Sequence, residues 1–389
     1  TRMAEKITRR VLVGYHKDAR ASTISFDNII EDIKDNNRQK RLVREILTPA
    51  TYGNNTEHTM LKFKAVVGNP PYQIMDGGAG VSATPLYNLF VDLAKHLKPN
   101  YISMIMPAKW YTDGKGLNAF RAEMLNDRHI SKLVDFTNSR DCFEGVDVAG
   151  GICYFLREND YNGDCEFVSV HNGQEKVSMR NLSLGDTFVR HIEAVAIVEK
   201  IQNKTSVFYN TKASSRKPFG LATNILPLES GDITLKYNKG EGPYDSSLIT
   251  VGKEMVSEWK VIVSRLTAEH AGQTDKEGRK KILSSLGLLA PNVICTETYL
   301  VIDSFKGKDE AEHLCKYLKT RFARFLIGII ASTQQLSKEK FAYVPLQDFT
   351  ATSDIDWSQS VENIDKQLYR KYGLADDEIA FIESMIKPM

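Results

Sequence analysis

The stretch that most constrains this chain runs from Ala65 to Tyr72 and has the sequence Ala-Val-Val-Gly-Asn-Pro-Pro-Tyr. Its apolar half predicts a short buried strand, and the prolines must end that strand because proline cannot continue a β-ladder. Asn69 precedes a proline and is therefore driven toward an extended backbone. A rigid loop at the carboxyl end of a strand is where open α/β sheets bind their ligands.

The groups on this loop suit the binding of a planar amine. The side-chain oxygen of Asn69 and the carbonyl of Pro70 can both accept hydrogen bonds from one amino group, and Pro71 stiffens the loop that carries them. Tyr72 offers a ring that can stack on a flat ligand. The alternative is a proline turn with a purely structural role.

Asn-Pro-Pro-Tyr at the end of a strand resembles the catalytic loop of the S-adenosylmethionine-dependent methyltransferases that modify exocyclic amines, above all the adenine-specific DNA methyltransferases of restriction–modification systems. Further stretches resemble the large members of this group, in which the methylase is fused to its own recognition domain: 73–80, 85–91, 101–110 and the tail 340–383. Protein-glutamine and ribosomal RNA methyltransferases carry similar loops, so methylation of RNA or of a protein glutamine stays open as an alternative.

The resemblance implies transfer of a methyl group from S-adenosylmethionine to the 6-amino group of a flipped adenine in a specific DNA sequence. The catalytic residues would be Asn69, Pro70, Pro71 and Tyr72. Cofactor contacts would come from the neighbouring Gly68 and from Asp27, for which a solvated turn is the alternative. The implied partners are double-stranded DNA and a nuclease or helicase domain or subunit of the same system.

Two cofactor-binding features of this family are missing from the chain. There is no glycine-rich turn after a first strand to hold the methionine end of the cofactor, and no acidic residue that closes a second strand and holds the ribose. By resemblance, Thr1 falls just after that second strand. We therefore expect a partial methyltransferase sheet, and a non-catalytic DNA-recognition fragment of such an enzyme is the alternative function.

Two domains are expected, at residues 1–160 and 161–389. In the first, alternating elements predict a mainly parallel sheet with helices on both faces, a partial Rossmann-like class I methyltransferase sheet, with an antiparallel hairpin at its edge. The expected strands are 62–68, 101–106, 130–136 and 150–156, and the expected helices are 29–47, 85–97 and 115–126. Turn formers near residues 158–165 mark the boundary. The second domain mixes short strands with long loops and with helices expected at 188–202, 308–331, 360–372 and 376–386, which is typical of an α+β target-recognition domain.

Several residues are candidates for contact with DNA. Lys109 and Trp110 follow the strand at 101–106 and should line the same cleft as the Asn69 loop, although Trp110 could instead be a packing residue. Arg216 and Lys217 lie in a loop with serines and a glycine, a flexible context for phosphate contact. Other basic groups occur at 38–44, 279–281 and 319–324. For each group the alternative is a solvated charged face.

Composition limits the other functions. With 51 basic and 49 acidic residues the net charge is +2, so a nucleic-acid protein of this kind must concentrate its cations on one face. Five cysteines without a CxxC pair and eight scattered histidines favour neither a disulfide framework nor a metal site, and fit a reducing cytoplasm. No apolar run approaches the roughly 18 residues of a membrane span.

Overall fold

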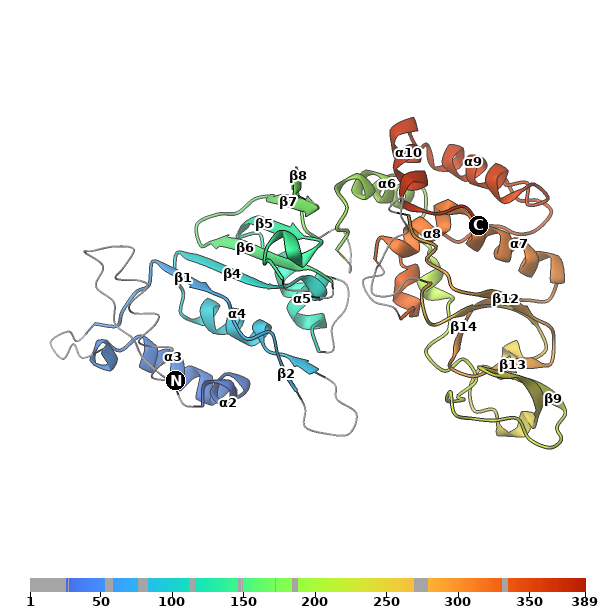
Figure 1. Ribbon diagram of the computed structural model, residues 1–389, viewed down its shortest axis with the longest axis horizontal. Helices are drawn as coiled ribbons and strands as arrows, with labels where there is room; N and C mark the ends of the chain where they lie inside the picture. Colours follow the sequence, from blue (N-terminus) through green and yellow to red (C-terminus); the bar gives the residue numbers. More distant parts are fainter. Residues whose placement is uncertain are drawn as a thin grey trace. The chain divides into compact units, whose positions relative to one another are not determined.

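The computed structural model describes residues 26, 28–52, 59–75, 83–111, 116–145, 148, 150–171, 173–183, 188–268, 279–330 and 335–389. The chain divides into two compact units. One comprises Thr1–Trp110 with Gly114–Ser183, and the other comprises Tyr111–Asp113 with Leu184–Met389. Each unit has its own sheets and helices (Figure 1).

The first unit is built on a six-stranded mixed sheet with the order β1-β4-β6-β5-β7-β8. Its strands are β1 (Ala65–Gly68), β4 (Tyr101–Pro107), β5 (Ile130–Phe136), β6 (Ile152–Glu158), β7 (Cys165–His171) and β8 (Gln174–Arg180). Strands β1 and β4 pair in parallel, as do β5 and β7. Strand β6 is inserted antiparallel between β4 and β5, and β8 runs antiparallel to β7. The expected α/β class is confirmed, but the sheet is mixed and not mainly parallel.

The predicted hairpin and the predicted boundary differ in position from the observed ones. Strands β5 and β6 do form an antiparallel pair, but they do not lie at the edge, because β7 and β8 extend the sheet beyond β5. Val168 and Val170 of β7 pack with Val134 of β5 in one apolar cluster, so burial ties β7 to the first unit. The division between the units accordingly falls after Ser183 and not at residue 160.

The described helices of the first unit are α2 (Ile29–Lys34), α3 (Asn36–Ile46), α4 (Tyr87–His96) and α5 (Asn118–Asn126), and a small hairpin joins β2 (Gln73–Met75) to β3 (Ala83–Pro85). Where the sequence favours one helix over 29–47, Asp35 divides two. Its carboxylate accepts from the backbone N–H groups of Asn37 and Arg38 and so caps α3. Ile33, Leu42 and Leu93 then bury the apolar sides of α2, α3 and α4 against one another.

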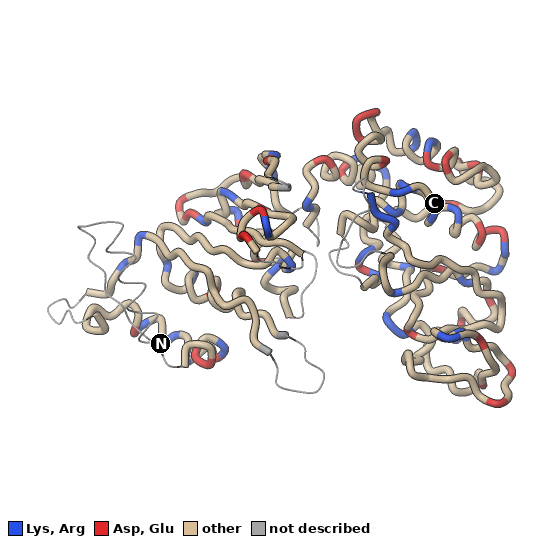
Figure 2. Tube along the Cα trace, viewed as in Figure 1, with Lys and Arg blue, Asp and Glu red and all other residues tan. Residues whose placement is uncertain are grey.

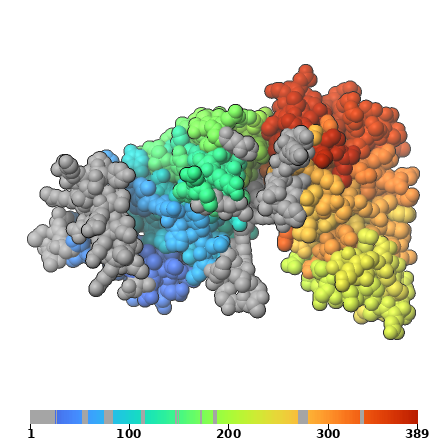
Figure 3. Space-filling view, in the orientation of Figure 1, coloured from blue at the N-terminus to red at the C-terminus, as the bar shows by residue number. Residues whose placement is uncertain are grey.

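The second unit contains two three-stranded sheets. One has the order β10-β9-β13 and the other β12-β11-β14. The strands are β9 (Ile233–Tyr237), β10 (Gly240–Tyr244), β11 (Trp259–Ser264), β12 (Leu286–Leu289), β13 (Val293–Cys295) and β14 (Tyr299–Phe305). In the space-filling view the yellow-green residues around β9 form one end of this unit and the red helices of the chain's end form the other (Figure 3).

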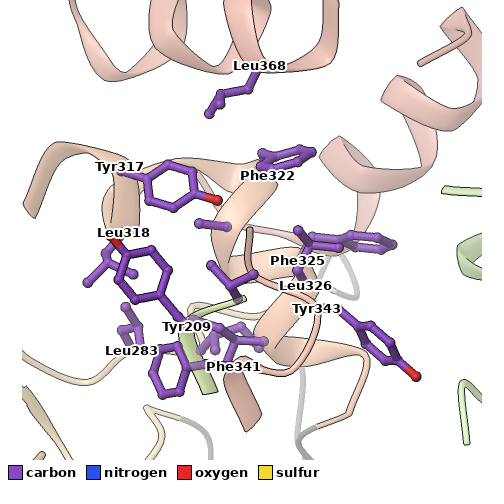
Figure 4. Close-up of a cluster of buried hydrophobic side chains, with 14 of the residues drawn as sticks. Tyr209, Leu283, Tyr317, Leu318, Phe322, Phe325, Leu326, Phe341, Tyr343 and Leu368 are labelled. Carbon is purple, nitrogen blue, oxygen red and sulfur yellow. The ribbon is translucent and has the colours of Figure 1, made fainter. Parts of the chain in front are cut away.

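The described helices of this unit are α6 (Ile192–Gln202), α7 (Lys308–Lys319), α8 (Arg321–Gly328), α9 (Val361–Tyr372) and α10 (Asp376–Met385). Helix α7 packs against the β11 sheet, and the helices pack against one another. A single helix expected over 308–331 is divided at Thr320, whose hydroxyl accepts from the N–H of Ala323 and caps α8. Aromatic residues such as Tyr209, Tyr317 and Phe322 fill the core between these elements (Figure 4). No helix in the described part of the chain is long and apolar enough to cross a membrane.

Candidate active site

The Asn-Pro-Pro-Tyr loop begins where β1 ends. Strand β1 covers only Ala65–Gly68 of the expected 62–68, and its register places Gly68 opposite Met104 of β4. The expectation of a buried strand is wrong. Val67 is 77% exposed, because within the described residues β1 pairs on one side only and forms the edge of the sheet. The loop is therefore held at the carboxyl end of an edge strand.

The four residues of the loop differ in their exposure. Asn69 and Pro71 are exposed, Pro70 is buried and Tyr72 is half-buried. The carbonyl of Tyr72 accepts a hydrogen bond from the N–H of Leu86, 3.1 Å away, which ties the loop to the start of α4. Buried Pro70 and this hydrogen bond fix the backbone on both sides of Pro71. The backbone that carries the side-chain amide of Asn69 is therefore constrained.

A cavity of about 290 Å³ adjoins the loop on the side of α4. Its lining is Val66, Val67, Gly68, Asn69, Pro70, Pro71, Phe90, Leu93, Ala94, Leu97 and Met104. Asn69 contributes the one polar side chain of this lining. The volume lies near the lower end of the roughly 300–1,000 Å³ of small-molecule sites, and an apolar wall with one amide suits a flat heteroaromatic ring.

Tyr72 is not part of that lining. Burial raises the pKa of its phenol. The structure thus brings Asn69, Pro70 and Pro71 together at the cavity, and the half-buried Tyr72 follows them outside its lining.

Gly68 and Asp27 were the expected cofactor contacts. Gly68 lines the cavity, and a Cβ at this position would meet Met104 Cε only at 3.9 Å, so there is open room over its backbone. Asp27 lies outside the described residues.

Lys109 and Trp110 follow β4 in a short 3₁₀ turn, Ala108–Tyr111. Lys109 is exposed and stays a candidate for contact with DNA. The expectation that Trp110 lines a base pocket is wrong, because its side chain is 0% exposed and its ring packs edge-on against Phe120. The packing alternative accounts for Trp110.

Arg216 and Lys217 are exposed in the second unit. Arg216 forms an ion pair with Glu297, at 2.9 Å between Nε and Oε2. Figure 2 shows Lys and Arg interspersed with Asp and Glu along both units, so contact with DNA needs particular groups and not a uniformly basic face.

Among the other basic groups, the one at 319–324 is not a free surface. Arg324 is fully buried, and its Nε donates to the carbonyls of Lys319 and Thr320. Arg321 pairs with Glu383 at 2.9 Å. These two arginines hold the start of α8 in place, so they are weaker candidates for contact with DNA than the exposed Arg216 and Lys217.

Two residues that the sequence did not single out lie beside Arg216. Glu297 follows β13, and Arg265 follows β11 and donates to the carbonyl of Glu297. They are far from Arg216 in sequence, and no local motif connects them.

Comparison with known proteins supports the resemblance seen in the sequence. The profile of the family described as "Eco57I restriction-modification methylase" matches residues 1–143. An "Uncharacterized adenine-specific methylase" of Mycoplasma pneumoniae is 36% identical over 111 residues, which are 28% of this chain and 26% of that protein. Residues 1–143 are thus similar to a restriction–modification methylase, and a stretch of 111 residues is similar to an adenine-specific methylase.

Solved structures of such systems are also similar to this chain, at low scores. The type IIG restriction endonuclease BpuSI matches with a TM-score of 0.31 and 12% identity, over 83% of this chain and 54% of that enzyme. The type IIL restriction–modification enzyme MmeI, solved in complex with DNA, matches with a TM-score of 0.40 and 10% identity, over 82% of this chain and 56% of that enzyme. The chain spans about a quarter of the curated relative and just over half of these two enzymes.

Proposed function

We propose that the chain carries the amine-binding site of a site-specific DNA adenine methyltransferase of a restriction–modification system. The reaction moves a methyl group from S-adenosylmethionine to the 6-amino group of an adenine. The observation that carries this proposal is an exposed Asn69, on a proline-fixed loop at the carboxyl end of β1, beside a cavity within the part of the chain that matches the methylase profile.

The target amine lies inside a paired and stacked duplex, so the adenine must be flipped out, at a cost of a few kcal/mol. Stacking on the ring of Tyr72, worth roughly 1–3 kcal/mol, offsets much of this cost. The side-chain oxygen of Asn69 and the carbonyl of Pro70 then accept the two amine hydrogens. This draws electron density onto the nitrogen and orients it for in-line attack.

The cavity fits part of the cofactor. Its apolar wall and the open space over the backbone of Gly68 suit the place where the methyl group of the cofactor meets the target adenine. Its lining contains no carboxylate that could hold the ribose hydroxyls. When bound, S-adenosylmethionine supplies an electrophilic methyl group, and the residues of this loop hold the acceptor nitrogen in position for it.

Recognition of double-stranded DNA is assigned to the second unit as a target-recognition domain, with Arg216 and Lys217 among its contacts. In the first unit, Lys109 is a separate candidate for contact with DNA. Arg216 is held by Glu297 and still exposes 68% of its side chain, which suits a phosphate or base contact. A nuclease or helicase domain or subunit of the same system would act on the same DNA in the cytoplasm.

The proposal is tested by incubating the chain with methyl-labelled S-adenosylmethionine and, in separate reactions, mixed-sequence duplex DNA, RNA and protein. Label on the adenine amine of DNA supports it, and label confined to RNA or to protein glutamine contradicts it. Isothermal titration with S-adenosylmethionine distinguishes the proposed methyltransferase from the remaining alternative, a non-catalytic DNA-recognition fragment. A chain that binds duplex DNA but neither binds the cofactor nor transfers label is a non-catalytic recognition fragment.

A further inference from the structure

A buried glutamate contacts two arginines in the second unit, Arg216 through its carboxylate and Arg265 through its backbone carbonyl. Glu297 is only 7% exposed. Its Oε2 lies 2.9 Å from Nε of Arg216, and its Oε1 accepts from the hydroxyl of Thr223 at 3.2 Å. Its backbone is fixed as well, because its N–H donates to the carbonyl of Leu221 at 2.9 Å. The carboxylate of Glu297 is therefore held in a fixed position, and it binds the exposed guanidinium of Arg216.

The loop that carries Arg216 is anchored at both ends. Ser214 exchanges hydrogen bonds with Val301 of β14, from N–H to carbonyl at 2.8 Å and from the N–H of Val301 to the Ser214 hydroxyl at 3.0 Å. Phe219 is fully buried in the apolar cluster around β9. Only the tip between these anchors is exposed, and it includes Arg216 and Lys217. The loop thus presents its cations from a fixed frame.

Arg265 completes the group from another element. Its Nη1 donates to the backbone carbonyl of Glu297 at 3.3 Å and its Nη2 to the side chain of Gln335 at 3.4 Å. Burial lowers the pKa of Arg265, and the positive charge of Arg216 lowers it further. Both arginines contact Glu297, Arg216 at the carboxylate and Arg265 at the backbone carbonyl. Two cations beside one glutamate leave an excess positive charge, which an acceptor-rich ligand would stabilise.

We propose that Glu297 is a positioning residue whose carboxylate holds Arg216, next to Arg265 on its backbone carbonyl, for contact with duplex DNA. This inference rests on the proposed function. Glu297 takes the Nε edge of the Arg216 guanidinium, which leaves N–H donors on the opposite edge for a ligand. Such a fork fits two acceptors side by side, either O6 and N7 of guanine or two phosphate oxygens.

The test compares Glu297→Gln with a matched control, Glu241→Gln. Glu241 lies in the same unit and pairs with Lys236 at 2.8 Å, on the surface. Both changes remove one negative charge, so a purely electrostatic effect makes both variants bind DNA slightly more tightly. Loss of positioning instead makes Glu297→Gln bind more weakly or less selectively than Glu241→Gln, by about tenfold. Thermal unfolding of each variant confirms that it is folded.

Two probes report the result with the full chain: a fixed duplex titrated over a series of salt concentrations, and a pool of duplexes with a randomised centre from which bound sequences are selected and read. If Arg216 contacts the DNA backbone, Arg216→Ala should reduce the salt dependence of DNA affinity by about one phosphate contact. If Arg216 instead contacts a guanine edge, Arg216→Lys should keep that salt dependence but lose the base preference at one position of the selected sequences.

Equal affinity, selectivity and salt dependence of Glu297→Gln and Glu241→Gln would overturn the inference, as would an Arg216→Ala variant that behaves like the wild type in both assays. In either case a wild-type chain that still binds duplex DNA leaves the proposed function standing. If the wild type binds no duplex at all, the inference and the DNA substrate fail together.

Discussion

The indole Nε1 of Trp110 donates a hydrogen bond to the sulfur of Cys153, with 3.4 Å between the two atoms. Cys153 lies on β6 and pairs with Met106 of β4, while Phe120 of α5 packs against the indole with 5.8 Å between the ring centres. Trp110 therefore connects the strand that neighbours β1 to β6 and α5. Its role is to hold the end of β4 against β6 and α5.

Replacement of this tryptophan should act on stability. Trp110→Ala removes a fully buried aromatic side chain and should lower the free energy of unfolding of the first unit by about 3–5 kcal/mol. Chemical denaturation measures this loss. Lys109→Ala, a change at the exposed neighbouring residue, is the control and should stay within about 0.5 kcal/mol of the wild type. A Trp110→Ala variant as stable as the wild type would show that the packing role is wrong.

Tyr72 should act through its ring. If the ring stacks on the flipped adenine, Tyr72→Phe retains most of the methyl transfer because stacking needs no hydroxyl. Tyr72→Ala should weaken capture of the flipped base by about 1–3 kcal/mol, which is roughly a 5- to 150-fold loss of transfer. Rates of labelled methyl transfer to duplex DNA measure both variants. Equal losses in both variants would assign a different role to the phenol.

Asp365 should make the stability of the second unit depend on pH. It is buried and accepts from the N–H groups of Arg321 and Phe322, at 3.0 and 2.9 Å. Burial raises its pKa from 3.8 to about 6. The folded state therefore binds the extra proton more tightly than the unfolded state. The contribution of Asp365 is complete below about pH 4 and is lost as the pH rises through about 6, by roughly 3 kcal/mol.

The contribution of Asp365 can be isolated by subtraction. The free energy of unfolding is measured from pH 3.5 to 7.5 for the wild type and for Asp365→Asn, which keeps an acceptor for α8 but does not titrate. The pH range of roughly 3.5 to 7.5 brackets both pKa values. The difference between wild type and variant should fall across the window from about 4 to 6 and be flat above it. A flat difference throughout would contradict the raised pKa.

Much of the fold followed from local patterns. The strands at 101–106 and 130–136 and the helices α4, α6, α9 and α10 agree with the apolar spacing and the turn residues of the sequence. The sequence did not predict the helix breaks at Asp35 and Thr320, although both residue types are common N-caps. The helical spacing of apolar residues continues across both positions, so each pair of helices reads as one. Local spacing is informative about an element's type and less so about its ends.

What depends on distant contacts could not be read from the chain. The exposure of Val67 depends on which strands flank β1, and the burial of Trp110 depends on Cys153 and Phe120 from other elements. Arg216, Arg265 and Glu297 lie on three loops that are far apart in the sequence and come together only in the folded second unit. The Asn-Pro-Pro-Tyr loop was recognisable because its chemistry is contained within four consecutive residues.

The most direct test of the central claim is labelled methyl transfer to duplex DNA by the wild type and by Asn69→Ala, with DNA affinity measured in parallel. The exposed position of Asn69 at the cavity predicts that the variant folds and binds DNA like the wild type. It should lose transfer by about 100-fold or more because one of the two amine acceptors is gone. Asn69→Asp, which keeps an acceptor oxygen, should lose less. Near wild-type methylation by Asn69→Ala would contradict the account.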